Sequence, residues 1–129
     1  MQVSIDVEDA VQAALNDLGR AACAVPVPVD LDQMLPLTCV RVLGGTRSSV
    51  VLDTFNIHFD TWADTPAEAV AESNLVAAAL CDMQGAELGG VPCYRVTLAS
   101  LPHADDDPDR PDLPRVTFMA QVTVRNIDT

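Results

Sequence analysis

Hydrophobic residues recur every three or four positions in two stretches of the chain, a spacing that predicts two amphipathic α-helices. The first stretch covers residues 6 to 22, and its apolar stripe consists of Val7, Val11, Leu15, Leu18 and Ala22. The second covers residues 65 to 83 and has a clear start, because Thr65 can cap the helix, Pro66 suits its first turn and Glu68 completes a capping box. Each helix should therefore bury one side and expose the other.

Four further stretches have the composition and alternation of β-strands, and they cover residues 37–43, 50–62, 91–99 and 116–124. In the second of them, apolar and polar residues alternate in the order Phe55, Asn56, Ile57, His58, Phe59 and Asp60. This pattern predicts that His58 faces solvent or a neighbouring subunit. The pairs Gly44-Gly45 and Gly89-Gly90 fit turns, and we expect the first pair to end its strand.

The predicted order of elements is α-β-β-α-β-β, within one domain that covers residues 1–129. Strands that are apolar on one side only favour an antiparallel sheet with helices on its apolar face. The sequence therefore predicts an α+β fold, in which two helices cover a mostly antiparallel four-stranded sheet.

Charge narrows the range of partners, because the chain has 19 acidic residues, 7 basic residues and a formal net charge of −12. This balance opposes binding to nucleic-acid phosphates and to anionic membranes. No apolar run approaches the roughly 18 residues that a membrane-spanning helix requires. The first residues lack the pattern of a secretory signal, so we expect the protein to be cytosolic where it is made.

The residue types that bind metals or carry out catalysis are present but not grouped in any known motif. Cys23, Cys39, Cys81 and Cys93 are too far apart for a zinc motif, so we expect small buried thiols. Asp60 and Asp64 flank Trp62 and could be imagined as an acid–base pair, but Asp60 lies on a predicted strand and Asp64 precedes a helix cap, so we interpret them as a solvated and a capping carboxylate. No dinucleotide, phosphate-loop or hydrolase motif occurs. We therefore expect no enzyme activity, no cofactor and no metal site.

The segment from His103 to Asp112 is unusual, because five aspartates stand there against one arginine. It lacks the glycine and the closing glutamate of an EF-hand loop, which argues against calcium. It could be a solvated, poorly ordered connection or an arm that contacts a partner. In the second case the contact residues would be Asp105, Asp106, Asp107, Asp109 and Arg110.

Across most of its length the chain resembles the tail terminator (tail completion) proteins of bacteriophages, prophages and gene transfer agents. The matching segments are Leu35-Pro36-Leu37, then Val42-Leu43-Gly44-Gly45, and the run from Phe55 to Thr65 that continues into Ala67-Glu68-Ala69. Further matches are Gly89-Gly90-Val91, the Pro/Asp-rich loop, Pro114-Arg115 and Val122-Thr123-Val124-Arg125. The likeness lies in the order of many weak motifs.

The resemblance implies a structural subunit of the virion that forms a ring, usually a hexamer, at the head-proximal end of the tail tube. Such a ring stops polymerisation of the tube and joins it to the head connector or neck protein. It implies as partners other copies of the chain, the tail tube protein and the connector, with DNA only as cargo in the channel and no membrane. The family has no catalytic residues.

Two other functions remain open at this point. A neck adaptor or minor tail subunit would occupy a different position in the same particle. A small-ligand-binding module would use the uncovered face of the sheet, although no convergent set of polar residues indicates a pocket there.

Overall fold

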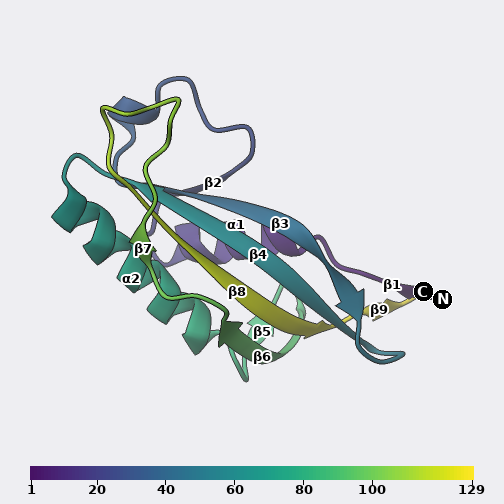
Figure 1. Ribbon diagram of the computed structural model, residues 1–129. Helices are drawn as coiled ribbons and strands as arrows, with labels where there is room; N and C mark the ends of the chain where they lie inside the picture. The colour runs from purple at the N-terminus through teal and green to yellow at the C-terminus, as the bar shows by residue number, and fades with distance from the viewer.

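Four long strands and three short ones form a twisted, mixed β-sheet in the computed structural model, which describes all 129 residues (Figure 1). The long strands are β3 (Leu37–Arg47), β4 (Leu52–Trp62), β6 (Val91–Leu98) and β8 (Arg115–Arg125). The short strands are β2 (Ala22–Ala24), β5 (Glu87–Leu88) and β7 (His103–Ala104). The order across the sheet is β2-β3-β4-β8-β6-β5, and β7 also pairs with β8.

All neighbouring strands are antiparallel except β2 and β3, which are parallel. Two further short strands, β1 (Gln2–Val3) and β9 (Ile127–Asp128), pair with each other in a separate ribbon. This ribbon holds the two ends of the chain together, since the Met1 ammonium donates to the Thr129 carbonyl over 2.6 Å.

The predicted α+β fold with a four-stranded sheet is wrong, because the structure is mostly β and its main sheet has seven strands. The three additional strands contain only two or three residues each. Segments this short show no alternation in sequence, and they become strands because a long strand lies beside them with unpaired backbone groups.

Helix α1 (Val7–Asp17) begins where the sequence predicts it but ends about five residues earlier than expected. The side chain of Asp6 caps its start, accepting a hydrogen bond from the amide of Asp9 over 3.2 Å. Its end is fixed by Gly19, whose φ of 81° is the left-handed conformation that commonly terminates helices. Ala22, predicted to lie on the helical stripe, instead begins β2.

Helix α2 (Pro66–Asp82) confirms the predicted start and end almost to the residue. The Thr65 hydroxyl accepts a hydrogen bond from the amide of Glu68 over 3.2 Å, as the capping motif requires. Gly85, with a φ of 85°, follows its end.

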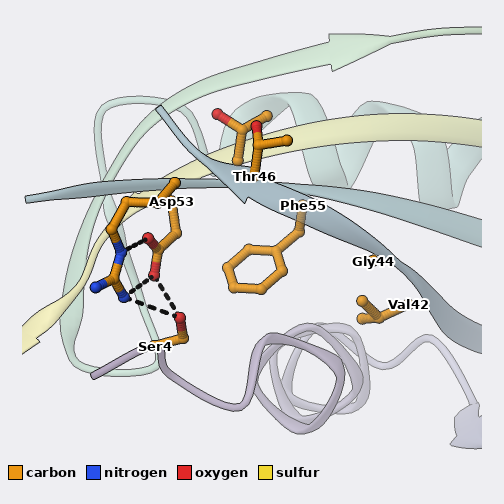
Figure 2. A pocket seen from close by; sticks show the side chains of 9 residues that line it. Ser4, Val42, Gly44, Thr46, Asp53 and Phe55 are labelled. Atoms are coloured by element: carbon orange, nitrogen blue, oxygen red, sulfur yellow. Dashed lines mark hydrogen bonds and ion pairs between the residues drawn. The ribbon is translucent and has the colours of Figure 1, made fainter. Parts of the chain in front are cut away.

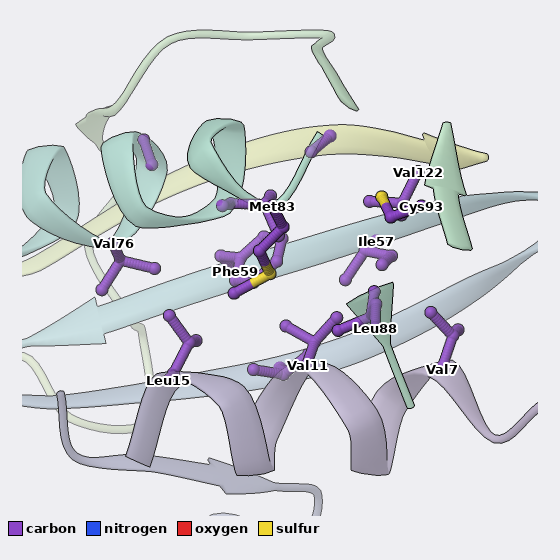
Figure 3. Close-up of a cluster of buried hydrophobic side chains, with 14 of the residues drawn as sticks. Val7, Val11, Leu15, Ile57, Phe59, Val76, Met83, Leu88, Cys93 and Val122 are labelled. Carbon is purple, nitrogen blue, oxygen red and sulfur yellow. The ribbon is translucent and has the colours of Figure 1, made fainter. Parts of the chain in front are cut away.

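Both helices pack against the same face of the sheet and close the main hydrophobic core there (Figure 3). At its centre, the rings of Phe59 on β4 and Phe118 on β8 stack with centroids 4.6 Å apart and planes 4° from parallel. Val11 and Leu15 from α1 and Leu80 from α2 reach the same core and are fully buried. The alternation predicted for β4 is confirmed, with Ile57 and Phe59 pointing inward.

A second, smaller cluster lies on the opposite face, at one end of the sheet. Its members alternate with the residues of the main core and are Leu31, Leu37, Cys39, Trp62 and Leu113. The single-turn helix η1 (Leu31–Gln33) and the segment before β8 cover it. The rest of this face has no layer of the chain over it, and we call it the open face.

Strand β3 continues through Gly44 and Gly45 to Arg47, so the prediction that this glycine pair ends the strand is wrong. The pairing of β3 with β4 shifts between Val42 and Gly44, where Gly44 adopts a φ of 115°. A side chain on Gly45 would collide with the backbone carbonyl of Thr54 on β4. The two glycines therefore allow an irregular pairing within a long hairpin. In sequence, a glycine pair with this role cannot be told from one that forms a turn.

The cysteines are all free, and they are less uniformly buried than predicted. Cys39 and Cys93 are buried, Cys23 is half-buried and Cys81 is exposed on α2. Cys23 and Cys39 are direct neighbours across the β2–β3 pair. A hydrogen bond to Cys23 and burial raise the pKa of the Cys39 thiol above its usual range, so this thiol stays protonated.

Candidate functional site

The acidic segment predicted to contact a partner follows β7 and folds back toward the start of β8. The amide of Asp105 donates to the carbonyl of Arg115 over 3.0 Å, which extends the β7–β8 pairing. Next, the Asp107 carboxylate accepts a hydrogen bond from the amide of Asp109 over 2.9 Å, closing a tight turn. Asp106 and Asp109 are exposed, whereas Asp107 and Arg110 are half-buried. Asp105 and Asp112 are exposed as well, but each lies beside an arginine, so Asp106 and Asp109 are the carboxylates that the segment presents to solvent without a cation.

Arg115, at the start of β8, is the residue around which this segment is organised. Its Nε donates to the carbonyl of Asp105 over 2.7 Å, and its guanidinium lies 3.6 Å from the Asp105 carboxylate and 3.9 Å from that of Asp107. On the sheet side it lies 3.9 Å from Asp60 and 5.9 Å above the ring of Trp62. One arginine from the same chain thus already partners two of the aspartates that the sequence assigned to a neighbour.

A polar cluster continues from Arg115 along the open face and includes His58, which the sequence predicted to face solvent or a neighbouring subunit. The His58 Nε2 lies 2.9 Å from the Asp60 carboxylate and 2.9 Å from the Thr117 hydroxyl. That hydroxyl also lies 2.8 Å from Asp60 and 3.0 Å from the carbonyl of Phe59. Only 18% of the His58 side chain is exposed, and its contacts with Asp60 and Thr117 hold it against the sheet.

We expect Arg115→Ala to loosen the acidic segment while leaving the sheet folded. The variant loses the bond to the Asp105 carbonyl and leaves Asp60, Asp105 and Asp107 without their shared cation. Hydrogen exchange measured by mass spectrometry should become faster in residues 103–110, with a loss of about 1–2 kcal/mol in stability. The matched control is Arg110→Ala, which loses one contact of 3.9 Å to Asp112. Equal exchange rates in all three proteins would contradict the organising role of Arg115.

A second polar group joins the turn end of the β3–β4 hairpin to residues near both ends of the chain (Figure 2). Asp53 accepts hydrogen bonds from Arg47 at 2.8 Å, from the Ser4 hydroxyl at 2.6 Å and from the Asn126 amide at 3.3 Å. These donors, Arg47 above all, hold the pKa of the Asp53 carboxyl below its usual range. A shallow hollow of about 330 Å³ lies here, and its lining includes Ser4, Arg47, Asp53 and Phe55. Because these donors already bind Asp53, the group ties the hairpin to residues near both ends of the chain, and we call it the clamp.

Asp60 and Asp64, considered in sequence as an acid–base pair, are not brought together. Asp60 belongs to the cluster with His58, whereas Asp64 is exposed before α2. Nowhere do three or more histidine, cysteine, aspartate or glutamate side chains converge as they would around a metal ion. No helix combines the length and the apolar composition needed to span a membrane.

The sequence identified the acidic segment but missed its organising residues. Arg115, Asp60 and His58 meet only because β4 pairs with β8 in a register that places Asp60 opposite Thr117. A local sequence pattern cannot predict which residues of two distant strands lie opposite each other. The one available signal for this cluster was the position of Arg115 directly after the acidic loop. Contact of Asp105, Asp106, Asp107, Asp109 and Arg110 with a partner stays a prediction.

Comparison with known proteins gives a result at the level of fold. No family model matches the chain, and no curated protein matches it by sequence. Among solved structures, a chain of the virion of a native gene transfer agent (GTA) particle has a similar fold, with a TM-score of 0.61. The two chains are 15% identical, and the alignment covers 95% of this chain and 99% of that one. The two proteins therefore share one complete fold.

Proposed function

We propose that this protein is a structural subunit of a phage-like virion. The observation that carries the proposal is the fold shared over nearly the whole of both chains with a component of a gene transfer agent virion. A match that leaves almost no residue of either chain unaligned argues against a common module inserted into unrelated proteins. The sequence resemblance to tail terminators points to the same class of particle.

Within that class, we propose the tail terminator position. The subunit would form a ring, in most relatives a hexamer, at the head-proximal end of the tail tube. There it would stop tube growth and bind the connector or neck protein, while DNA passes through the channel as cargo. The chain-wide order of motifs supports this position.

The architecture is compatible with a ring. The subunit has a helical face, an open sheet face and a long hairpin, so different surfaces of one copy can contact different neighbours. Contacts between unlike surfaces generate rings when the rotation between copies closes. A formal charge of −12 would also keep DNA from adhering to a channel built from these subunits.

The test is to delete the gene from the particle that encodes it and to measure tail length by electron microscopy. If the protein is the terminator, tails made without it should grow past their normal length and fail to join heads. Supplying the wild-type gene separately should restore both normal length and joining. Labelled protein should lie at the head-proximal end of purified tails. Normal tail length with unjoined heads would indicate the neck adaptor instead, and particles without this chain would refute a virion role.

A further inference from the structure

Three of the seven basic residues have no partner within the subunit, although the chain carries 19 acidic residues. Arg20 pairs with Glu72, Arg47 with Asp53, Arg110 with Asp112, and Arg115 with the acidic segment. The remaining arginines form neither an ion pair nor a side-chain hydrogen bond, and they are Arg41, Arg95 and Arg125. In so acidic a protein, three unpaired cations require an explanation.

All three arginines project from the open face of the sheet. Arg41 on β3 lies opposite His58, and Arg95 on β6 lies opposite Thr123. Arg125 follows Val124 on β8, and because Val124 points into the main core, Arg125 points away from it. Each of the three is exposed.

The surface between these arginines is polar and uncharged. The Thr54 and Thr123 hydroxyls lie 2.9 Å apart, and the Gln121 amide donates to Asn56 over 3.0 Å. Asp60 is the only acidic residue that the four long strands place on this face, and it is already held by His58 and Arg115. Away from the acidic segment at its Arg115 end, the open face is therefore positive in a protein that is strongly negative overall.

The helical face on the other side of the molecule has the opposite charge. Neither helix contains a basic residue in its last turn, where Asp17 and Asp82 lie exposed. Between the helices runs a groove of about 340 Å³, whose lining includes the apolar Leu18 and Leu75 and the charged Arg20 and Asp82. Arg20 is already paired with Glu72, so the unpaired charge beside the groove is acidic. These leucines are 59% and 52% exposed. An apolar centre with a charged rim is the usual composition of a protein-binding surface.

We propose that the open face of one copy docks onto the helical face of a second copy, with Arg41, Arg95 and Arg125 directed at the acidic last turns of the two helices beside the groove. The two faces lie on opposite sides of the subunit, so they pair between copies and not within one. This head-to-tail contact is the type that closes into a ring. The inference rests on the proposed ring and adds to it the surfaces that form it.

Duplex DNA is a less suitable occupant of the open face. Tight electrostatic binding to DNA uses about six or more phosphate contacts, and one subunit offers three unpaired arginines. The remaining surface, with its large excess of carboxylates, would repel the duplex. The helical face, by contrast, offers both the opposite charge and exposed apolar area.

The experiment uses two charge reversals of the complete chain. One variant carries Arg41→Glu, Arg95→Glu and Arg125→Glu, and the other carries Asp17→Arg and Asp82→Arg. Arginine at the last turn of a helix suits the helix dipole, so the second variant should stay folded, as circular dichroism would verify. The control for the second variant carries Asp30→Arg and Asp32→Arg, which make the same charge change on exposed residues of another region.

Self-association is measured by sedimentation velocity at low and moderate salt. We expect wild-type association that weakens with salt, at least about tenfold weaker association of each variant alone, and recovery when the two variants are mixed. Recovery is specific, because each reversed face then meets its complement on the other chain. The control should associate at least as well as the wild type.

Several results would overturn the inference: a wild-type protein that is monomeric under all conditions, variants that associate normally, or a mixture that does not recover. Salt-dependent binding of duplex DNA that the arginine reversals abolish would also overturn it. Variants that assemble normally on tails would refute these surfaces and leave the proposed tail position intact. Absence of the wild-type protein from tails would instead refute the proposed function.

Discussion

Replacing Phe59 with alanine is expected to lower the free energy of unfolding by about 3–5 kcal/mol, the range typical of a large buried aromatic residue. Phe59 is fully buried on a central strand, and its ring stacks on Phe118. The variant loses this stacking and leaves a cavity under both helices, which the rigid sheet cannot close. Urea denaturation followed by circular dichroism measures the loss.

The control is Val29→Ala, since Val29 is 96% exposed and its truncation should change stability by less than about 0.5 kcal/mol. Phe118→Ala should cost as much as Phe59→Ala. The double variant should cost less than the sum of the two, because both rings border one cavity. A loss below about 1 kcal/mol for Phe59→Ala would mean that the stacked pair is not the centre of the core.

The second large effect is expected from Asp53→Asn at the clamp. The carboxylate is 5% exposed and accepts hydrogen bonds from Arg47, Ser4 and Asn126. The amide is uncharged and can accept at only one of its two atoms, so the ion pair with Arg47 is lost and the hydrogen bonds cannot all be kept. We expect a loss of about 2–4 kcal/mol at neutral pH. Asp32→Asn, on an exposed residue, is the matched control and should be nearly neutral.

The dependence on pH separates a charge effect from a packing effect. Because Arg47 and the other donors lower the pKa of Asp53 in the folded state, its contribution is fully present above the pKa of the unfolded chain, about 3.9. The contribution is lost as pH falls from there through the folded pKa. The difference in stability between wild type and Asp53→Asn should therefore shrink in acid. A difference that stays constant down to acid pH would assign the effect to packing.

The elements with a strong periodic pattern were predicted well from sequence. The start of α2 at Thr65 and Pro66 and the inward alternation of Phe55, Ile57 and Phe59 depend only on neighbouring residues, and the structure confirms them. The fold class was nevertheless wrong, since it was decided by strands such as β7, whose two residues have no pattern of their own. Their state depends on which long strand lies beside them.

The candidate site was less predictable than the fold for a related reason. The acidic segment is visible as composition, but its pairing with Arg115 depends on how the start of β8 lies beside β4 and β7. The alternation of β3, β4, β6 and β8 already places Arg41, Arg95 and Arg125 on the polar sides of their strands. That they share one face and lack acidic partners follows only from the strand order.

The position of β8 has a consequence for how the subunit is made. This strand is the last long one in the chain, yet it lies at the centre of the sheet, between β4 and β6. Until β8 has been synthesised, the edges of β4 and β6 that pair with it therefore have no partner, and unpaired strand edges favour aggregation and chaperone binding. The sheet becomes complete only when β8 leaves the ribosome. A chain truncated before β8 lacks both central pairings and cannot mimic a finished subunit, so premature products would be excluded from assembly by their failure to fold.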